Sequence, residues 1–220
     1  MFNKMLKARM LWGGVNVYSI KDNFVFFPEV LQTRNESELY RGTWQSPLYF
    51  KGVENDVRLA FRFDVSKLND TTESLLDMIR TCNSVSLHIR RNDYLSDGYA
   101  LGFGGICTPD YYHRATSYIQ QRIVQPRFII FSDDIGWCQN NLDIPEAVYV
   151  DCNYGSESWQ DMFLMSQCKH NIIANSSFSW WGAWLNAHPD KIVIAPDKWW
   201  HGINDDVVPP EWIRLSGINL

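Results

Sequence analysis

The part of this chain best suited to chemistry is an apolar strand that ends in charged residues. Residues 84–94 have the sequence Ser-Val-Ser-Leu-His-Ile-Arg-Arg-Asn-Asp-Tyr, so that Arg90 and Arg91 directly follow the strand. Central strands of α/β sheets are normally apolar, and ligands bind outside their carboxyl ends. A guanidinium group offers a rigid fork of donors for phosphate or carboxylate oxygens. The segment therefore indicates either an oxyanion site or an ion-paired strand end on the surface.

A second candidate segment lies where a predicted strand turns into a helix. Residues 175–181 have the sequence Asn-Ser-Ser-Phe-Ser-Trp-Trp. The first backbone N–H groups of a helix have no partner within the helix, and the dipole favours an anion there. Ser176 and Ser177 would add hydroxyl donors. Serine is also a common N-cap residue that needs no ligand, so ordinary helix capping is the alternative interpretation.

Two adjacent carboxylates, Asp133 and Asp134, follow the strand predicted at residues 128–131. Many sugar-transferring enzymes hold a divalent metal with an acidic pair, so a metal site has to be considered. No cluster of His, Asp or Glu accompanies this pair, and adjacent residues of an extended chain point to opposite sides. We therefore expect no metal, and we assign Asp133 to a nucleotide or structural contact and Asp134 to a helix cap.

The elements that would hold these residues follow a regular order from about residue 70. Capping signals begin helices at Asp70 and at Thr108-Pro109, where proline is tolerated because the first helical position needs no N–H. Helical segments alternate with apolar strands predicted at residues 85–90, 128–131, 147–150, 171–174 and 191–195. This alternation is typical of βαβ units and predicts an α/β fold with a doubly wound parallel sheet.

Composition limits the class of protein. A chain of 220 residues that is 45% hydrophobic can bury a sizeable core. Its formal charge of −5 argues against a general nucleic-acid binder, which needs a basic face. The sequence contains no apolar run of about 18 residues and no secretory signal. Five cysteines without a C-x-x-C pair favour reduced thiols, and together these features predict a cytoplasmic protein without a transmembrane segment.

Two features leave further alternatives open. The first 70 residues are less regular, with strands predicted only at residues 24–27 and 59–63, and they could be a fragment of a second domain. The chain also has ten tryptophans. Aromatic faces stack well on sugars, but indoles are more often part of a core or an interface. A non-catalytic, Trp-rich sugar-binding module is therefore one hypothesis for the function.

Three short motifs occur in a fixed order along the chain. Residues 88–94, His-Ile-Arg-Arg-Asn-Asp-Tyr, form the first, and residues 131–134, Phe-Ser-Asp-Asp, with Trp137-Cys138 form the second. The third comprises residues 161–165 with 168–170 and then 173–185. The first motif resembles the H-x-R-R-x-D-Y signature of the bacterial-type α-1,2-fucosyltransferases that use GDP-fucose, and the other two are similar to that family's second and third motifs. The resemblance covers roughly residues 23–215.

The resemblance implies a GT-B-type glycosyltransferase. Residues 1–80 would be a partial acceptor-side domain with a connecting segment, and residues 81–220 a Rossmann-like domain that binds GDP-fucose. The reaction would be that of a galactoside 2-α-L-fucosyltransferase, metal-independent and inverting: GDP-β-L-fucose gives an α-1,2 linkage to a β-galactoside in a surface glycan. The implied partners are this donor and a glycan acceptor, with no further cofactor. A lipid-linked acceptor would bring the chain to the inner membrane face.

The resemblance also assigns roles in donor binding. Arg90 would bind the pyrophosphate, since without a metal the charge on the departing β-phosphate needs fixed cationic donors. Ser176 and Ser177 would complete this site, and His88 would orient or contact the donor. The other donor contacts expected from the motifs are Arg91, Asn175 and Phe178.

Three carboxylates remain as candidates for the nucleoside and the acceptor. Asp133 is the first choice for the nucleoside contact, and Asp161 is the second. Asp93 lies in the signature and could accept the proton of the acceptor hydroxyl as general base. Its alternatives are to hold Arg91 or to cap the following turn.

The beginning of the chain departs from the family pattern. Family members normally begin with a strand and a Gly-Gly-x-Gly-Asn-Gln loop, whereas this chain has Gly13-Gly14-Val15-Asn16 and nothing after it that fits. The loop would lie at the donor–acceptor cleft, so we expect donor binding with weak or undetectable transfer. Either Met1 is an internal start of a longer protein, or the gene has lost its beginning and the chain is an inactive GDP-fucose-binding remnant.

Overall fold

The computed structural model describes residues 6–9, 16–19, 24–32, 38–42, 44–202 and 205–217. The glycine segment at residues 13–15 lies outside them. The chain divides into two compact units, one of residues 1–57 with 202–209 and the other of residues 58–201 with 210–220. The helix that precedes the first strand of the larger unit's sheet packs within that unit, and the expected domain boundary at residue 80 stays a prediction.

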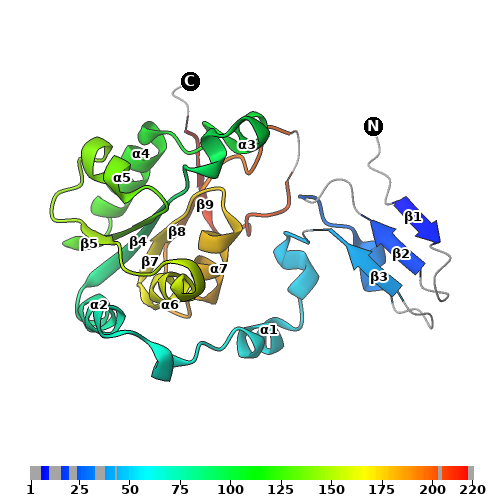
Figure 1. Ribbon diagram of the computed structural model, residues 1–220, viewed down its shortest axis with the longest axis horizontal. Helices are drawn as coiled ribbons and strands as arrows, with labels where there is room; N and C mark the ends of the chain where they lie inside the picture. The colour runs from blue at the N-terminus through cyan, green and yellow to red at the C-terminus, as the bar shows by residue number, and fades with distance from the viewer. Residues whose placement is uncertain are drawn as a thin grey trace. The chain divides into compact units, whose positions relative to one another are not determined.

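The larger unit is built on a six-stranded parallel sheet (Figure 1). Its strand order, β6-β5-β4-β7-β8-β9, places the arginine-ended strand β4 in the interior of the sheet. The chain builds outward from β4 to β6, then returns to the other side of β4 with β7, so the expected doubly wound α/β fold is confirmed. The strands are β4 (Asn83–Ile89), β5 (Pro126–Ser132), β6 (Val148–Val150), β7 (His170–Ile172), β8 (Val193–Pro196) and β9 (Ile213–Leu215).

Helices link these strands, and most begin where side-chain chemistry predicts. Asn69 caps the first helix of the sheet by accepting the N–H of Thr72 at 2.8 Å, and Thr108 caps another just before Pro109. Asp134 accepts the N–H of Trp137 at 3.0 Å, which confirms it as a helix cap. The helices are α2 (Asp70–Thr81), α3 (Asp97–Phe103), α4 (Pro109–Gln120), α5 (Ile135–Asn141), α6 (Trp159–Gln167) and α7 (Ser177–Leu185).

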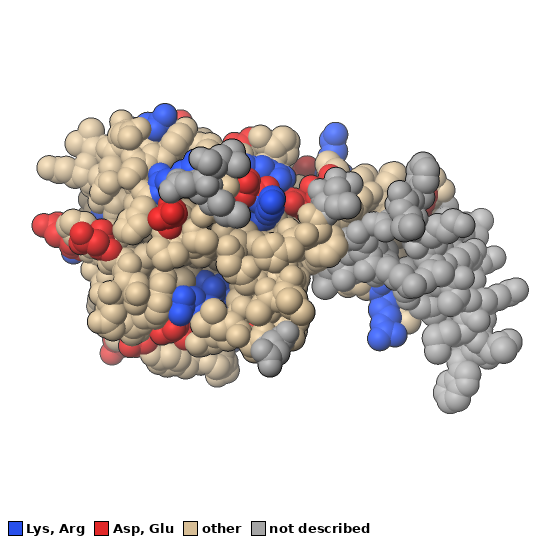
Figure 2. Space-filling model, turned by 90° about the horizontal axis from the view of Figure 1, so that it is seen from above, with Lys and Arg blue, Asp and Glu red and all other residues tan. Residues whose placement is uncertain are grey.

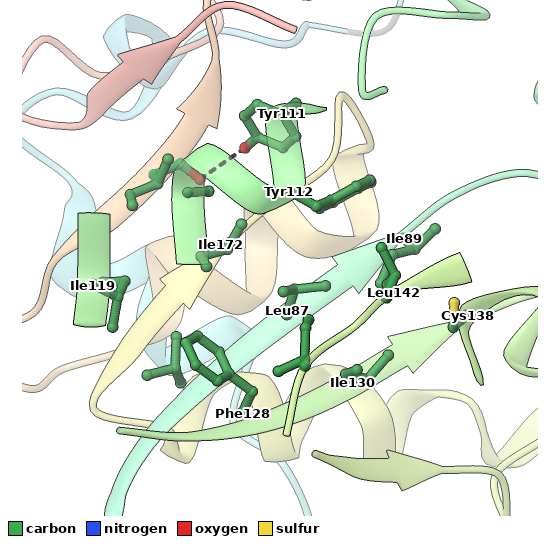
Figure 3. Packing of buried hydrophobic residues seen from close by; sticks show 14 residues of the cluster. Leu87, Ile89, Tyr111, Tyr112, Ile119, Phe128, Ile130, Cys138, Leu142 and Ile172 are labelled. Carbon is green, nitrogen blue, oxygen red and sulfur yellow. Dashed lines mark hydrogen bonds between the residues drawn. The ribbon is translucent and has the colours of Figure 1, made fainter. Parts of the chain in front are cut away.

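The sheet has an apolar core on each face. Val85, Leu87 and Ile89 of β4 pack with residues of α4 and α5, including Tyr111 and Tyr112, which are almost completely buried (Figure 3). The opposite face of the sheet packs against α2 and α6. Each large apolar side chain buried in this way contributes about 1.5–3 kcal/mol relative to exposure. Because side chains alternate along a strand, Ser84, Ser86 and His88 belong to that second face.

A buried hydrogen-bond network joins the second face to its helices. The side-chain amide of Asn171 in β7 donates to Ser86 Oγ at 2.7 Å and to the carbonyl of Met165 in α6 at 2.9 Å. Asn186, just after α7, donates to Asn171 Oδ1 and to the carbonyl of Cys168, both at 2.7 Å. Buried polar groups have to be satisfied in this way, so the network fixes how α6 and α7 pack on the sheet.

The smaller unit carries a three-stranded mixed sheet of β1 (Leu6–Arg9), β2 (Asn16–Ser19) and β3 (Glu38–Arg41). Helix α1 (Glu54–Ala60) crosses the division between the units. The strand predicted at residues 59–63 is wrong. Residues 59–60 end helix α1, whose first turn carries the acidic residues Glu54 and Asp56 that favour a helix start, and residues 61–63 form no strand. The strand predicted at residues 24–27 is irregular instead. No helix among the described residues is long and apolar enough to cross a membrane.

Candidate functional site

The strand order of the larger unit reverses between β4 and β7. These two strands are neighbours and parallel, yet β4 is followed in sequence by β5 on one side while β7 leads to β8 on the other. Open α/β sheets bind their ligands outside the carboxyl ends of the strands at such a point. The loop after β4 carries Arg90, and the loop after β7 leads into α7. The fold thus brings the first and third motifs of the sequence to one place.

Arg90 is held on one side by two carboxylates. Asp93 accepts hydrogen bonds from Nε and Nη2 of Arg90, both at 2.9 Å, and Oδ2 of Asp133 lies 3.3 Å from the same Nε. Asp133 also accepts the backbone N–H groups of Arg91 at 2.9 Å and Asn92 at 3.2 Å. Within the described part of the chain, Nη1 of Arg90 has no hydrogen-bond partner, and the side chain is 36% exposed. Arg90 therefore has free donors on its open side.

Arg91 packs against α5. Its Nε lies 3.2 Å from a carboxylate oxygen of Asp134, and its guanidinium carbon lies 3.8 Å from the centroid of the Trp137 ring. Such a cation–π contact combined with an ion pair anchors a guanidinium group. The structure thus uses Arg91 to fasten the loop to α5. Trp137 was recognised in the sequence only as part of a motif.

Asp93 accepts its hydrogen bonds from Arg90 and not from Arg91, which was one of the alternatives that the sequence left open. The hydrogen bond from the Arg90 guanidinium lowers the pKa of the Asp93 carboxyl below its usual value. A carboxylate whose pKa is lowered accepts protons less readily. In this arrangement Asp93 is better suited to orient Arg90 than to act as a general base.

His88 is a buried neutral imidazole. Burial, reinforced by the nearby charge of Arg90, lowers the pKa of His88 to about 3. Its Nδ1 is buried and has no hydrogen-bond partner among the described residues. The ring lies 5.8 Å from that of Phe178 in the first turn of α7. An unsatisfied buried polar atom normally has an explanation, and the described contacts supply none for this one.

The N-terminus of α7 is open. Ser176 occupies the N-cap position, but its side chain makes no capping hydrogen bond. Ser177 is exposed, and Phe178 is half-buried. In the described structure the first helical N–H bound to a carbonyl is that of Trp180, which donates to Ser176. The earlier N–H groups are therefore available to an anion, so capping by serine does not account for this segment.

Asn175 is engaged within the protein. Its amide donates to the carbonyls of Phe103 and Trp199, both at 3.1 Å, and its Oδ1 accepts from the Cys107 thiol at 3.5 Å. Its backbone carbonyl accepts the hydroxyl of Tyr94 at 2.7 Å. The side chain expected to contact a donor is thus used to fix the loop that leads into α7.

Asp161 lies in the first turn of α6, at the same edge of the sheet. Burial raises the pKa of Asp161 to about 6. Its Oδ1 accepts from Asn153 at 2.8 Å, and Asn153 in turn accepts from Asn69 at 2.8 Å and Thr72 at 3.2 Å. Among the described residues Oδ2 of Asp161 accepts no hydrogen bond. This is a carboxylate with one oxygen still available.

The charged side chains around Arg90 carry a small net negative charge. Two guanidinium groups, Arg90 and Arg91, face three carboxylates, Asp93, Asp133 and Asp134. Figure 2 shows the same intermingling of basic and acidic side chains on the face it displays. In the part of the chain that the structure describes, no three His, Cys, Asp or Glu side chains form a group that could hold a metal ion. An anion at this site would therefore be bound by individual donors and not by a broad basic surface.

Comparison with known proteins places the chain in a family. The sequence profile of glycosyl transferase family 11 matches residues 22–216. An α-1,2-colitosyltransferase of Escherichia coli is 41% identical over 180 residues, which are 80% of this chain and 61% of that protein. The O-antigen biosynthesis glycosyltransferase WbnK of Escherichia coli is 46% identical over 138 residues, covering 60% and 45%. The chain thus spans less than two thirds of the length of these relatives.

The chain also has more distant similarities. The galactoside α-(1,2)-fucosyltransferase 1 of Saimiri boliviensis boliviensis is 27% identical over 183 residues, covering 76% of this chain and 50% of that protein. Among solved structures, the NodZ α-1,6-fucosyltransferase soaked with GDP-fucose is 18% identical with a TM-score of 0.43, and the match covers 71% of this chain and 55% of that one. On the strength of the profile match and the bacterial relatives, this chain is a member of glycosyl transferase family 11.

Proposed function

We propose that this chain binds GDP-fucose, with the diphosphate between Arg90 and the first turn of α7. The observation that carries the proposal is the meeting of these two groups where the strand order reverses, between β4 and β7. A guanidinium group with free donors and an uncapped helix N-terminus both favour phosphate oxygens.

The nucleoside is assigned to Asp161 in preference to Asp133. Both oxygens of Asp133 are already committed, since they accept backbone N–H groups from Arg91 and Asn92 and lie near Arg90. Asp161 keeps one free oxygen beside a network of fixed amides. This free carboxylate oxygen can accept an N–H group from the edge of guanine, where N1 and the 2-amino group donate, whereas N1 of adenine is an acceptor. In this proposal Asp133 does not contact the nucleoside but holds the loop after β4 that carries Arg90.

The reaction we propose for the complete protein is inverting transfer to the 2-hydroxyl of a galactoside. The acceptor oxygen forms a bond to C1 of fucose while the bond from C1 to the β-phosphate oxygen breaks. GDP leaves with the electron pair, and the hydroxyl proton passes to a base. The negative charge that grows on the β-phosphate would be stabilised by Arg90 and the α7 N-terminus, without a metal. Asp93 orients Arg90 in this scheme, so the base is a different group.

A second donor deserves to be tested beside GDP-fucose. One bacterial relative is an α-1,2-colitosyltransferase. Colitose differs from fucose only in lacking the 3-hydroxyl, so the diphosphate and nucleoside contacts proposed above would serve either sugar. The choice between them is a property of the sugar pocket, to which the described contacts assign no residue.

Titration calorimetry tests the donor proposal. The chain is titrated with GDP, ADP and UDP, and then with GDP-fucose and GDP-colitose. We expect GDP to bind and ADP to bind much more weakly. Equal binding of all three diphosphates would overturn the nucleoside assignment, and no binding of GDP would overturn the proposal. For the reaction, product analysis with GDP-fucose and lactose compares this chain with a form that also carries an acceptor-side domain from a relative, and an α-1,2-linked fucosyl product from either form would support the proposal.

A further inference from the structure

The loop after β4 and the loop after β7 are joined by one side chain. Tyr94 lies in the turn that follows Arg90, and its hydroxyl donates to the backbone carbonyl of Asn175 at 2.7 Å. Asn175 immediately precedes Ser176, the N-cap of α7. The two residues joined by this bond are separated by 81 positions in the sequence. The bond therefore connects the segment that carries the guanidinium group with the segment that presents the helix N-terminus.

A third residue, Phe103, contacts both Tyr94 and Asn175, and we call these three residues the joint between the two loops. The ring of Tyr94 stacks on that of Phe103, with centroids 5.6 Å apart and ring planes at 26°. The carbonyl of Phe103 accepts the side-chain amide of Asn175 at 3.1 Å. Tyr94, Asn175 and Phe103 thus form a triangle of one hydroxyl bond, one amide bond and one ring contact. A closed set of contacts fixes a distance better than a single bond does.

The joint reaches Arg90 through Asp93, the residue directly before Tyr94. Asp93 holds the Arg90 guanidinium with two hydrogen bonds of 2.9 Å. On the other side, the carbonyl that Tyr94 binds belongs to the peptide that leads into α7, so its orientation sets where the first N–H groups of the helix point. Fixing both ends by one residue would pre-organise a site for two linked phosphates.

We infer that the Tyr94 hydroxyl is a positioning group that holds the Arg90 loop at a set distance from the first turn of α7. Tyr94 itself touches no phosphate; it acts through Asp93 on one side and Asn175 on the other. Burial raises the pKa of Tyr94 well above its usual value, so the hydroxyl keeps its proton at physiological pH. The part of this inference that concerns phosphate rests on the proposed function, whereas the joint between the loops does not.

The test is Tyr94→Phe, which removes the hydroxyl and keeps the ring stacked on Phe103. Two readouts are used: amide hydrogen exchange of the ligand-free chain, and calorimetry with GDP and GMP. We expect faster exchange in residues 90–95 and 174–180 together, and GDP affinity about fivefold weaker, as the loss of one half-buried hydrogen bond predicts. GMP, which has one phosphate, should lose less, so the ratio of GDP to GMP affinity should fall.

Two control variants separate positioning from general destabilisation. Tyr111→Phe also loses a hydroxyl bond to the loop after β7, the 2.6 Å bond to the carbonyl of Ile173. Among the described contacts, however, the Tyr111 hydroxyl has none with the Arg90 loop. Tyr99→Phe removes an exposed hydroxyl from another ring near Phe103. Neither should change the ratio of GDP to GMP affinity. A Tyr111→Phe effect on that ratio as large as that of Tyr94→Phe would overturn the inference.

The two readouts also keep this inference apart from the proposed function. If the parent chain does not bind GDP, the proposed function fails, and hydrogen exchange alone decides whether Tyr94 joins the two loops. If GDP binds but Tyr94→Phe changes neither exchange nor the affinity ratio, the positioning role is wrong while the donor site stands. Exchange that rises only in residues 90–95 would likewise overturn it, because the joint requires both loops to respond.

Discussion

Replacement of Arg90 by alanine should weaken GDP binding about 30-fold while the fold is retained. Truncating one partner of a buried charged pair costs on the order of 2–5 kcal/mol. Arg90 is 36% exposed, so solvent screens it, and the low end of about 2 kcal/mol, or about 30-fold, applies. Stability should fall by only about 1 kcal/mol, because partly exposed ion pairs contribute little and Asp133 keeps two backbone donors.

The assay is calorimetry with GDP, together with thermal denaturation to confirm folding. Arg127→Ala is the matched control. Arg127 is 38% exposed and pairs with Glu146 at 3.1 Å, but it lies near the amino end of β5, at the opposite edge of the sheet. Arg90→Lys should recover part of the affinity, since an ammonium group keeps the charge but cannot form a fork with Asp93 and also reach a phosphate.

Two results would refute the reasoning about Arg90. If Arg90→Ala binds GDP as tightly as the parent chain, the diphosphate does not lie at the end of β4. If Arg127→Ala loses as much affinity as Arg90→Ala, the effect reflects the overall charge of the chain and not a contact. A loss that appears only as a large drop in melting temperature would instead assign Arg90 a structural role.

Four further outcomes are expected. Addition of EDTA should leave the calorimetric GDP affinity unchanged, and a loss that magnesium or manganese restores would contradict metal-independent binding. Because the pKa of Asp161 is raised to about 6, folding takes up a proton between about pH 4 and about pH 6, and this carboxyl makes stability fall as the pH rises through that window. Asp161→Asn should flatten the dependence of the melting temperature on pH between about pH 4 and about pH 6. It should also reduce the preference for GDP over ADP. An unchanged pH profile would show that the carboxyl is not buried as described. Asp134→Ala should lower the free energy of unfolding in urea by about 1 kcal/mol through loss of the α5 cap. Because it also removes the ion pair that fastens Arg91 to α5, GDP affinity should fall, but by less than in Arg90→Ala, and an equal loss would extend the site to α5. Gly182→Ala should cost about 1–3 kcal/mol in the same measurement, because the new Cβ would lie 2.8 Å from the Cβ of Met165, and no loss would show that α6 and α7 can separate locally.

The sequence predicted the larger unit well because its signals are local. Alternating apolar strands and capped helices identified β4 to β8. Strand β4, which Arg90 follows, also has its carboxyl end at the edge of the sheet where a ligand was expected. Strand β9 (Ile213–Leu215) was missed because it has three residues and an exposed charged residue in its middle. Tryptophan content was ambiguous in the sequence, and burial of Trp180, Trp199 and Trp212 favours the core interpretation for these three.

The partners of the site residues could not be predicted in the same way. The fork between Arg90 and Asp93 depends on the short helical turn after β4, which the sequence does not signal. The commitment of Asn175 depends on carbonyls of Phe103 and Trp199, which lie far away in the sequence. Tyr94 was part of a motif, but its contact with Asn175 needs the adjacency of β4 and β7. Spacing identifies candidate residues, whereas their roles follow from tertiary neighbours.

The Asn171 network has a consequence for how the larger unit comes apart. One side chain bonds to β4 through Ser86, to α6 through the Met165 carbonyl and to the end of α7 through Asn186. Detaching α7 alone would leave buried amide groups without partners, at about 1–3 kcal/mol each. Helix α7 is therefore expected to melt together with the sheet in one cooperative step, so that an intermediate with an intact sheet and a displaced α7 is not populated during denaturation.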